Sequence, residues 1–173
     1  NGQGSEDETV VALTIASYMC ILGGAYDNFD IAYNELSNII KTGKALDKLK
    51  ELISLQGGNP DIVDDPTKLP SAKYSIEVKA LKSGFVTSID AEGIGIAAML
   101  LGAGRMTKED SIDYAAGITL TKKMGDAVSA GDTICILHTN KDNVESAFNK
   151  ALESFEIGNE NVKIDKFIYD IVM

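Results

Sequence analysis

Residues 125–134 read GDAVSAGDTI, and this stretch decides how the second half of the chain folds. Gly-Asp pairs at 125–126 and 131–132 bracket a short apolar segment at 127–128, and a second apolar segment follows at 133–138. Glycine adopts the positive φ that tight turns require, and aspartate hydrogen-bonds to nearby backbone in such turns. Paired turns around short apolar strands predict a tightly folded β unit.

The flanking sequence extends this unit in both directions. Segments of alternating polarity that are rich in β-branched residues predict strands at 74–79, 84–89, 118–120 and 167–172. The apolar stretch GIGIAAMLLGAG at 93–104 predicts a short helix closed by glycines, and residues 143–154 predict an amphipathic helix. The second half is therefore predicted to be mixed α+β.

The first half has a different pattern, that of three helices. We expect them at about 6–22, 28–42 and 44–56, each ended by glycine. Ser5 and Glu8 have the spacing of a capping box at the first helix. Apolar residues lie around nearly the whole circumference of that helix, which predicts burial on most sides. Residues 59–70, NPDIVDDPTKLP, hold all three prolines of the chain and predict a boundary without a long regular element.

Composition narrows the functional classes. The chain has 173 residues, of which 45% are hydrophobic, with 26 acidic and 16 basic side chains and a formal net charge of −10. Nucleic-acid backbones and anionic membranes bind clustered Lys and Arg, so neither is expected as a partner. Cys20 and Cys135 lie in apolar patterns and are interpreted as buried thiols. Without a signal-peptide pattern or an apolar run of about 18 residues, we expect a cytoplasmic protein.

Gly93, Gly95 and Ala98 match the G-x-G-x-x-A pattern of dinucleotide-binding turns. Asp90 and Glu92 would stand where the pyrophosphate must approach, which argues against nucleotide binding. Close helix packing is the alternative explanation of these small residues. His138 has no partner at a catalytic spacing and is interpreted as structural or exposed.

The loop around Gly102, Gly104 and Arg105 is a further candidate site. Its glycines and the only arginine of the chain could hold an anion. Acidic residues follow at 109, 110 and 113. The alternative is therefore that Arg105 pairs with one of them and orders the loop or a domain contact.

The two Gly-Asp turns resemble those of biotinyl and lipoyl carrier domains, and Lys141 falls where such carriers keep the modified lysine. Lys141 lacks the flanking residues of the carrier signature, and a helix rather than a mirror-image strand is expected after it. Carriers also have no use for the long helical insertion between Ile89 and Ile118. A carrier domain modified at Lys141 is kept as the alternative function.

The whole segment from Val78 to Asn140, VKALKSGFVTSIDAEGIGIAAMLLGAGRMTKEDSIDYAAGITLTKKMGDAVSAGDTICILHTN, resembles the C-terminal domain of the pyrimidine-nucleoside phosphorylases. Upstream, NGQGSEDE and the segment from Gly43 to Pro70 are similar to the part of that family that joins its central α/β domain to the C-terminal domain. The resemblance implies cleavage of uridine or thymidine by inorganic phosphate, giving the free base and a pentose 1-phosphate. It also implies a homodimer and no cofactor besides phosphate as co-substrate.

The resemblance gives the fold class α+β in three parts. Residues 1–58 would be the helical remnant of an α/β domain, 59–73 a linker, and 74–173 the C-terminal domain, with a barrel-sandwich-like (biotinyl/lipoyl-like) β unit and an inserted helix. The family's phosphate-loop signature and its pyrimidine-binding Arg, Ser and Lys have no counterpart here. No catalytic, substrate-binding or metal-binding residue is therefore assigned.

We consequently expect the C-terminal portion of a longer phosphorylase, inactive by itself, whose partners are the missing N-terminal part and a second subunit. The loop of Gly102, Gly104 and Arg105 is expected to contact or support the rest of the enzyme during cleft closure.

Overall fold

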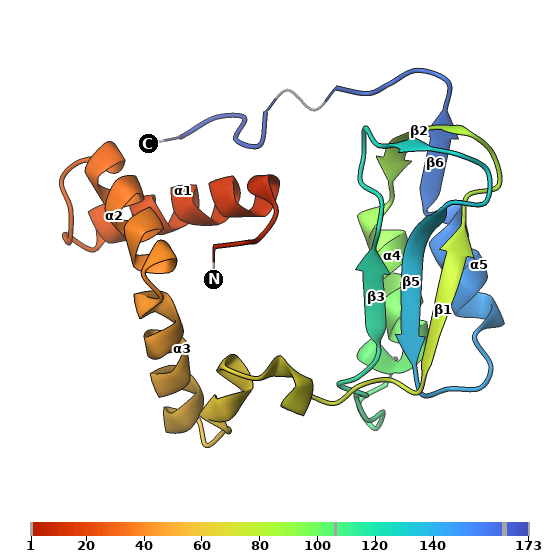
Figure 1. The fold of residues 1–173 in the computed structure, drawn as a ribbon, viewed down its shortest axis with the longest axis horizontal. Helices are drawn as coiled ribbons and strands as arrows, with labels where there is room; N and C mark the ends of the chain where they lie inside the picture. Colours follow the sequence, from red (N-terminus) through yellow and green to blue (C-terminus); the bar gives the residue numbers. More distant parts are fainter. Residues whose placement is uncertain (1, 106, 164–165, 173) are drawn as a thin grey trace. The chain divides into compact units, whose positions relative to one another are not determined.

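The computed structural model of the chain describes residues 2–105, 107–163 and 166–172. Residues 1, 106, 164, 165 and 173, which the predicted domains 1–58 and 74–173 include, lie outside the described residues. Two compact units form (Figure 1). The first contains the described residues up to Lys68 together with 166–172, and the second contains those from Leu69 to Lys163. The break after Lys68 falls within the predicted linker.

The first unit is built on three helices at the predicted places: α1 (Glu6–Leu22), α2 (Phe29–Lys41) and α3 (Lys44–Leu55). Asn28 caps α2, its side chain accepting a hydrogen bond from the Ile31 N–H at 3.1 Å. The predicted capping box at α1 is wrong. Ser5 is the N-cap residue, but its side chain accepts no capping hydrogen bond.

Helix α1 is not buried on most sides in the described chain, contrary to the prediction. Leu13 and Ser17 are its buried residues, and α2 packs against this helix. Ile15, Met19 and Leu22 are 55%, 66% and 87% exposed. Helix α2 packs on α1, and Ile168 and Ile171 line a groove with the exposed residues, but a wide apolar face of α1 stays in contact with solvent.

The proline-rich boundary forms two single-turn 3₁₀ helices, η1 (Pro60–Val63) and η2 (Pro66–Lys68). Their short length confirms that this segment contains no long regular element. Lys50 on α3 and Asp64 after η1 form an ion pair at 2.7 Å, and Lys68 and Asp61 form another at 3.2 Å.

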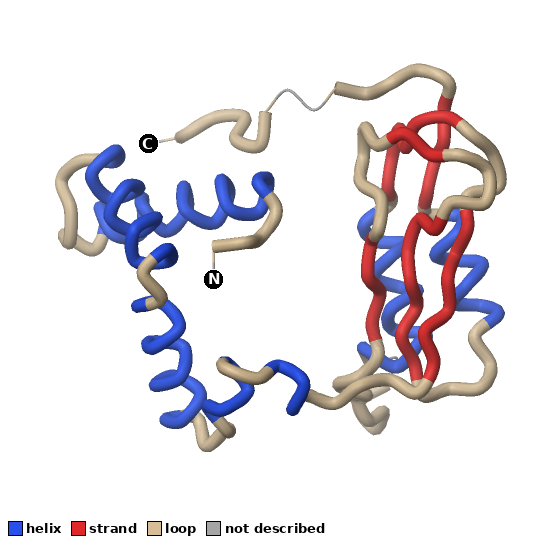
Figure 2. The backbone as a smooth tube through the Cα atoms, in the orientation of Figure 1, coloured by secondary structure: helices blue, strands red, loops and turns tan. Residues whose placement is uncertain are grey.

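The second unit contains two antiparallel sheets of three strands (Figure 2). The first sheet has the strand order β1-β5-β3 and consists of β1 (Tyr74–Lys79), β5 (Thr133–Thr139) and β3 (Gly117–Leu120). The second sheet has the strand order β4-β2-β6 and consists of β4 (Ala127–Val128), β2 (Gly84–Ile89) and β6 (Phe155–Gly158). The predicted α+β class is thereby confirmed. The barrel-sandwich likeness stays a prediction.

Two helices pack on one face of the β1-β5-β3 sheet, as Figures 1 and 2 show: α4 (Ala91–Ala98), continued by the short π-helix η3 (Met99–Ala103), and α5 (Glu145–Glu153). The core lies between them and the sheet. Val78, Cys135 and Leu137 from the sheet and Leu101 from η3 are fully buried there. Burial of this apolar surface is the main stabilising contribution to the unit.

The last predicted strand, at 167–172, is wrong. Its described residues adopt no regular structure and join the first unit, where Ile168 and Ile171 line a groove beside α1. The edge strand β6 was not predicted, because only Ser154 separates it from α5 and no turn signal announces it. It pairs with β2, Val86 lying opposite Ile157.

The two Gly-Asp turns have the same geometry. Gly125 and Gly131 both have φ of +92°. The N–H of Gly125 donates to the carbonyl of Val86 and that of Gly131 to the carbonyl of Ala80, each at 2.8 Å. In return, the Val86 N–H donates to the Asp126 carbonyl at 2.9 Å, and the Ala80 N–H to the Asp132 carbonyl at 2.8 Å. Each turn is thus held to upstream backbone, within β2 at Val86 and just after β1 at Ala80, by a reciprocal pair of hydrogen bonds.

Candidate functional site

The candidate loop begins where the α4 and η3 helical segment ends. Gly102 is buried and has φ of +115°, a conformation that side-chain-bearing residues rarely adopt, and it breaks the helix there. A Cβ at Gly102 would lie 3.3 Å from Asp113 Cβ and 3.7 Å from Lys141 Cε. Glycine is therefore required by conformation and by close packing together.

Three successive carbonyls at the end of this helical segment each have a separate donor. Lys141 Nζ donates to the Leu100 carbonyl at 2.8 Å, and Thr139 Oγ1 donates to the Leu101 carbonyl at 2.8 Å. The backbone N–H of Asp113 donates to the Gly102 carbonyl at 2.9 Å. The last carbonyls of a helix have no partner within the helix, so these three donors hold the loop's first residues in place.

Arg105 is exposed and forms no ion pair with another described residue. The expectation that it pairs with a following acid is wrong in this structure, because two of those acids have other partners. Asp110 accepts hydrogen bonds from the N–H and the hydroxyl of Thr107 at 2.9 and 3.0 Å. Asp113 accepts from Asn140 Nδ2 at 2.9 Å and from the Ala115 N–H at 3.0 Å.

Lys141 does not have the setting of a carrier lysine. Its amine is held by the Leu100 carbonyl, and the chain continues into α5 rather than into a paired strand. A modified lysine must project freely from a turn to reach successive active sites. The geometry around Lys141 gives the carrier alternative no support.

Close packing explains one of the two glycines of the α4 motif, Gly93, but not Gly95. A Cβ on Gly93 would collide with Ser154 Oγ and lie 2.7 Å from Asp90 Oδ2, whereas nothing lies within 4 Å of a Cβ on Gly95. Asp90 caps α4 by accepting a hydrogen bond from the Glu92 N–H at 3.1 Å. Its carboxylate thus lies where a dinucleotide turn would receive a phosphate, which is unfavourable for an anion.

His138 lies in the middle strand of the β1-β5-β3 sheet, between two hydroxyl groups. Ser75 Oγ lies 3.1 Å from Nδ1, and Thr119 Oγ1 lies 2.9 Å from Nε2. Both ring nitrogens have partners, and none of the cavities found among the described residues is lined by His138. The arrangement is a hydrogen-bonded row across three strands, as expected for a structural histidine.

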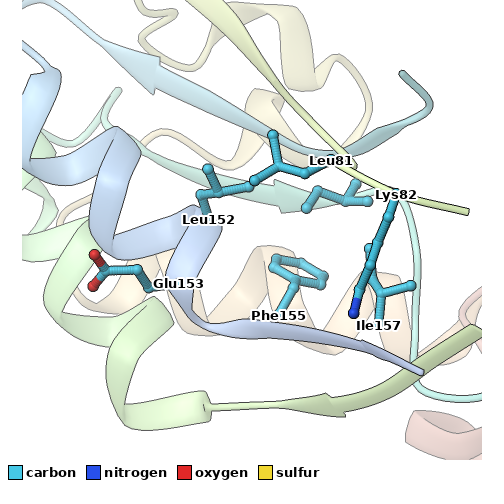
Figure 3. A pocket seen from close by; sticks show the side chains of 7 residues that line it. Leu81, Lys82, Leu152, Glu153, Phe155 and Ile157 are labelled. Atoms are coloured by element: carbon cyan, nitrogen blue, oxygen red, sulfur yellow. The ribbon is translucent and has the colours of Figure 1, made fainter. Parts of the chain in front are cut away.

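A cavity of about 410 Å³, which the sequence did not reveal, opens beside β6 (Figure 3). Its lining is apolar apart from Lys82 and Glu153, and comprises Leu81, Lys82, Ile134, Leu152, Glu153, Phe155 and Ile157. In Figure 3 the apolar side chains gather around Phe155, while the carboxylate of Glu153 points away from them. Apolar residues of this kind are ordinary core formers, so no sequence signal marks the cavity.

Metal ligands do not gather in the part of the chain that the structure describes: no three His, Cys, Asp or Glu side chains there are placed to hold an ion. No described helix is long and apolar enough to cross a bilayer.

Comparison with known proteins identifies the domain that carries the candidate loop. Residues 85–158 match the family model described as the pyrimidine nucleoside phosphorylase C-terminal domain. The chain is 45% identical over 171 residues to a pyrimidine-nucleoside phosphorylase of Bacillus subtilis, an alignment that covers 99% of this chain and 39% of the relative. It is 47% identical over 156 residues to that of Staphylococcus epidermidis, covering 90% of this chain and 36% of the relative.

A Staphylococcus aureus pyrimidine-nucleoside phosphorylase is 43% identical over 172 residues, which cover 99% of this chain and 40% of the relative. The chain thus spans well under half the length of the relatives that it matches. None of these relatives supports the carrier alternative. The chain is thus similar along most of its length to the C-terminal portion of pyrimidine-nucleoside phosphorylases, and residues 85–158 carry the C-terminal domain of that family.

Proposed function

We propose that the chain is the C-terminal part of an enzyme that cleaves a pyrimidine nucleoside with inorganic phosphate and releases the free base and a pentose 1-phosphate. The observation that carries this proposal is similarity along 99% of the chain to an enzyme of which it spans 39%. In this proposal inorganic phosphate is the co-substrate and no further cofactor takes part. The complete enzyme acts as a cytoplasmic homodimer.

The part described here supports the fold rather than the chemistry. The cavity beside β6 is lined mainly by leucine, isoleucine and phenylalanine, with Lys82 and Glu153 as its charged side chains, and it lacks the convergent polar groups that would hold both a phosphate and a pyrimidine ring. The phosphate and base contacts belong, in this proposal, to preceding sequence. The chain alone is therefore inactive.

The exposed face of α1 is consistent with this division. Ile15, Met19 and Leu22 are more than half exposed and lie on one helix, where a second layer would bury them. Contiguous exposed apolar surface of this kind is typical of an interface. In the complete enzyme, the remainder of the central domain covers this face.

The loop of Gly102, Gly104 and Arg105 contacts the rest of the enzyme when the substrate cleft closes. Arg105 is suited to this role because its guanidinium is exposed and unpaired with other described residues, while the base of the loop is fixed by three hydrogen bonds. A fixed base with a free cation at its end presents the charge at a defined place.

The proposal is tested by measuring phosphate-dependent release of uracil or thymine. The 173-residue chain is compared with a protein that also carries the preceding sequence of its reading frame. Activity in the longer protein alone is expected. Activity in neither protein contradicts the phosphorylase function, and activity in the shorter chain contradicts the assignment of the chemistry to preceding residues. Sedimentation of the longer protein at twice its subunit mass is expected for the homodimer.

A further inference from the structure

We infer that Asn140 is a positioning residue that couples the entry of the chain into the second unit to the loop that presents Arg105. The role of Asn140 in the enzyme rests on the proposed function of that loop. The coupling between the entering chain and the loop can be measured in this chain alone. Asn140 directly follows β5 and is exposed, so packing does not explain its contacts.

Both ends of the Asn140 amide are used. Its Oδ1 accepts a hydrogen bond from the backbone N–H of Lys73 at 2.8 Å, and its Nδ2 donates to Asp113 Oδ2 at 2.9 Å. The chemistry of the two partners fixes the orientation of the amide. Turning it over would set its NH₂ against the Lys73 N–H and its oxygen against a carboxylate.

The Lys73 side of this bridge is where the chain enters the sheet. Lys73 immediately precedes β1, and the next residue, Tyr74, donates its hydroxyl hydrogen to Asp142 Oδ1 at 2.6 Å. Lys73 Nζ also lies 3.8 Å from Asp142 Oδ1. The segment after β5 therefore holds the entering chain through Asn140 and Asp142.

The Asp113 side is where the loop is closed. The backbone N–H of Asp113 donates to the Gly102 carbonyl at 2.9 Å, and its Cβ lies 3.3 Å from the place of a Cβ on Gly102. The neighbours of Asn140, Thr139 and Lys141, hold the two preceding carbonyls. Asn140 therefore connects the entering chain to the Asp113 end of the loop, while its two neighbours hold the start of the loop.

The unique arginine makes the coupling measurable. Arg105 is the only arginine in the sequence, so an arginine-specific protease has one cleavage site, inside this loop. Cleavage of a native protein requires local opening, and its rate under weak protease conditions reports the population of the open form. The cleavage rate of the folded chain thus measures how firmly the loop is held.

Two variants test the bridge. Asn140→Asp keeps the acceptor for Lys73 but places a carboxylate against Asp113, and we expect cleavage to become about threefold to fivefold faster. Adding Asp113→Asn restores a donor and an acceptor in reversed order, because the amide is then at position 113 and donates to the carboxylate at position 140. The double variant is expected to return to within about twofold of the unmodified chain.

The control is Ser83→Ala. It removes a hydrogen bond of similar kind, from the Ala130 N–H to Ser83 Oγ at 2.9 Å, beyond the other end of β1. We expect its cleavage rate to be unchanged.

Three results would overturn the inference: an unchanged rate in Asn140→Asp, no recovery in the double variant, or equal acceleration in Ser83→Ala. No nucleoside enters this assay, so a negative result leaves the proposed phosphorylase function standing, and inactivity of the longer protein leaves the coupling standing.

Discussion

Asp126 and Asp132, six residues apart, make the same two hydrogen bonds. The Asp126 carboxylate accepts from the Lys123 N–H at 2.7 Å, and the Asp132 carboxylate accepts from the Ser129 N–H at 2.9 Å. The backbone N–H of each aspartate donates back to the carbonyl of that same earlier residue, at 3.1 and 3.0 Å. Two copies of one four-residue turn therefore set the path into β4 and into β5.

The glycines of these turns are expected to tolerate substitution differently. Gly131→Ala strains only the backbone, because nothing lies within 4 Å of the added Cβ, and should lower the free energy of unfolding by about 1 kcal/mol. Gly125→Ala has the same φ and adds a Cβ 3.1 Å from the Val162 carbonyl oxygen. We expect Gly125→Ala to be the more destabilising of the two in urea unfolding, and an equal loss would show that the Val162 segment moves aside.

Thr139→Val tests the hydrogen bonds of a fully buried hydroxyl. Thr139 Oγ1 donates to the Leu101 carbonyl and accepts from the Lys141 N–H at 3.1 Å, so valine, of the same shape, leaves both backbone groups without that partner. The expected loss in unfolding free energy is about 1–3 kcal/mol. Thr119→Val is the matched control: it removes the hydrogen bond to His138 Nε2 at an exposed position, where water can replace the lost partner, and should change the unfolding free energy by less than about 0.5 kcal/mol. Equal effects of the two changes would contradict a special role for Thr139.

Burial raises the pKa of the Cys135 thiol to about 11, from an ordinary value of 9.0. The folded chain therefore resists forming the thiolate, and at pH 8 iodoacetamide should modify the half-buried Cys20 while Cys135 reacts only after denaturation. Modification of Cys135 in the native chain at a rate similar to that of Cys20 would contradict this expectation.

The same pKa gives a pH dependence of stability. Between pH 9 and 11 the unfolded chain loses the Cys135 proton while the folded chain keeps it, so stability must fall as the pH rises through this interval. Other groups titrate there too, and comparison with Cys135→Ala isolates this contribution. The difference in unfolding free energy between the unmodified chain and Cys135→Ala is expected to decrease from pH 9 to 11 and to be constant below pH 9.

If the loop contacts the rest of the enzyme as proposed, Arg105→Ala in the longer protein should lower kcat/KM for nucleoside cleavage by between about threefold and tenfold, since the loop would lose the charge that makes this contact. Lys108→Ala, a nearby exposed cation, is the control and should have little effect. Unchanged turnover and unchanged stability in Arg105→Ala would remove the proposed role of the loop.

Sequence patterns predicted the elements that local turn chemistry delimits. The strands at 74–79 and 84–89 and the helix starting at Lys44 were predicted at their observed bounds, because glycine and proline punctuate the chain beside them. The segment 167–172 has the alternation of a strand but finds no partner strand among the described residues. Alternation alone does not distinguish a paired strand from an extended tail.

The candidate loop was recognisable from Gly102, Gly104 and Arg105, but the residues that hold it were not. Thr139 and Asn140 meet the loop across 38 and 27 positions of sequence, and neither lies in a pattern that indicates a tertiary hydrogen bond. Charge spacing predicted an Arg105 ion pair that does not form among the described residues, whereas Asp110 and Asp113 accept hydrogen bonds from Thr107, Ala115 and Asn140. The fold, and not the spacing of charges in the sequence, decides which partner each carboxylate binds.

The duplicated turn also has a consequence for how the chain reaches its native state. Either Gly-Asp pair can offer Val86 the same reciprocal hydrogen bonds, and closing a loop of 45 rather than 39 residues from Val86 changes the entropy of closure very little. Loop closure therefore does not select between two registers, six residues apart. Side-chain packing must choose between them, because the shifted register would put Ile134 in the place of the smaller Val128. The core, rather than the turns themselves, thus fixes which Gly-Asp pair meets Val86.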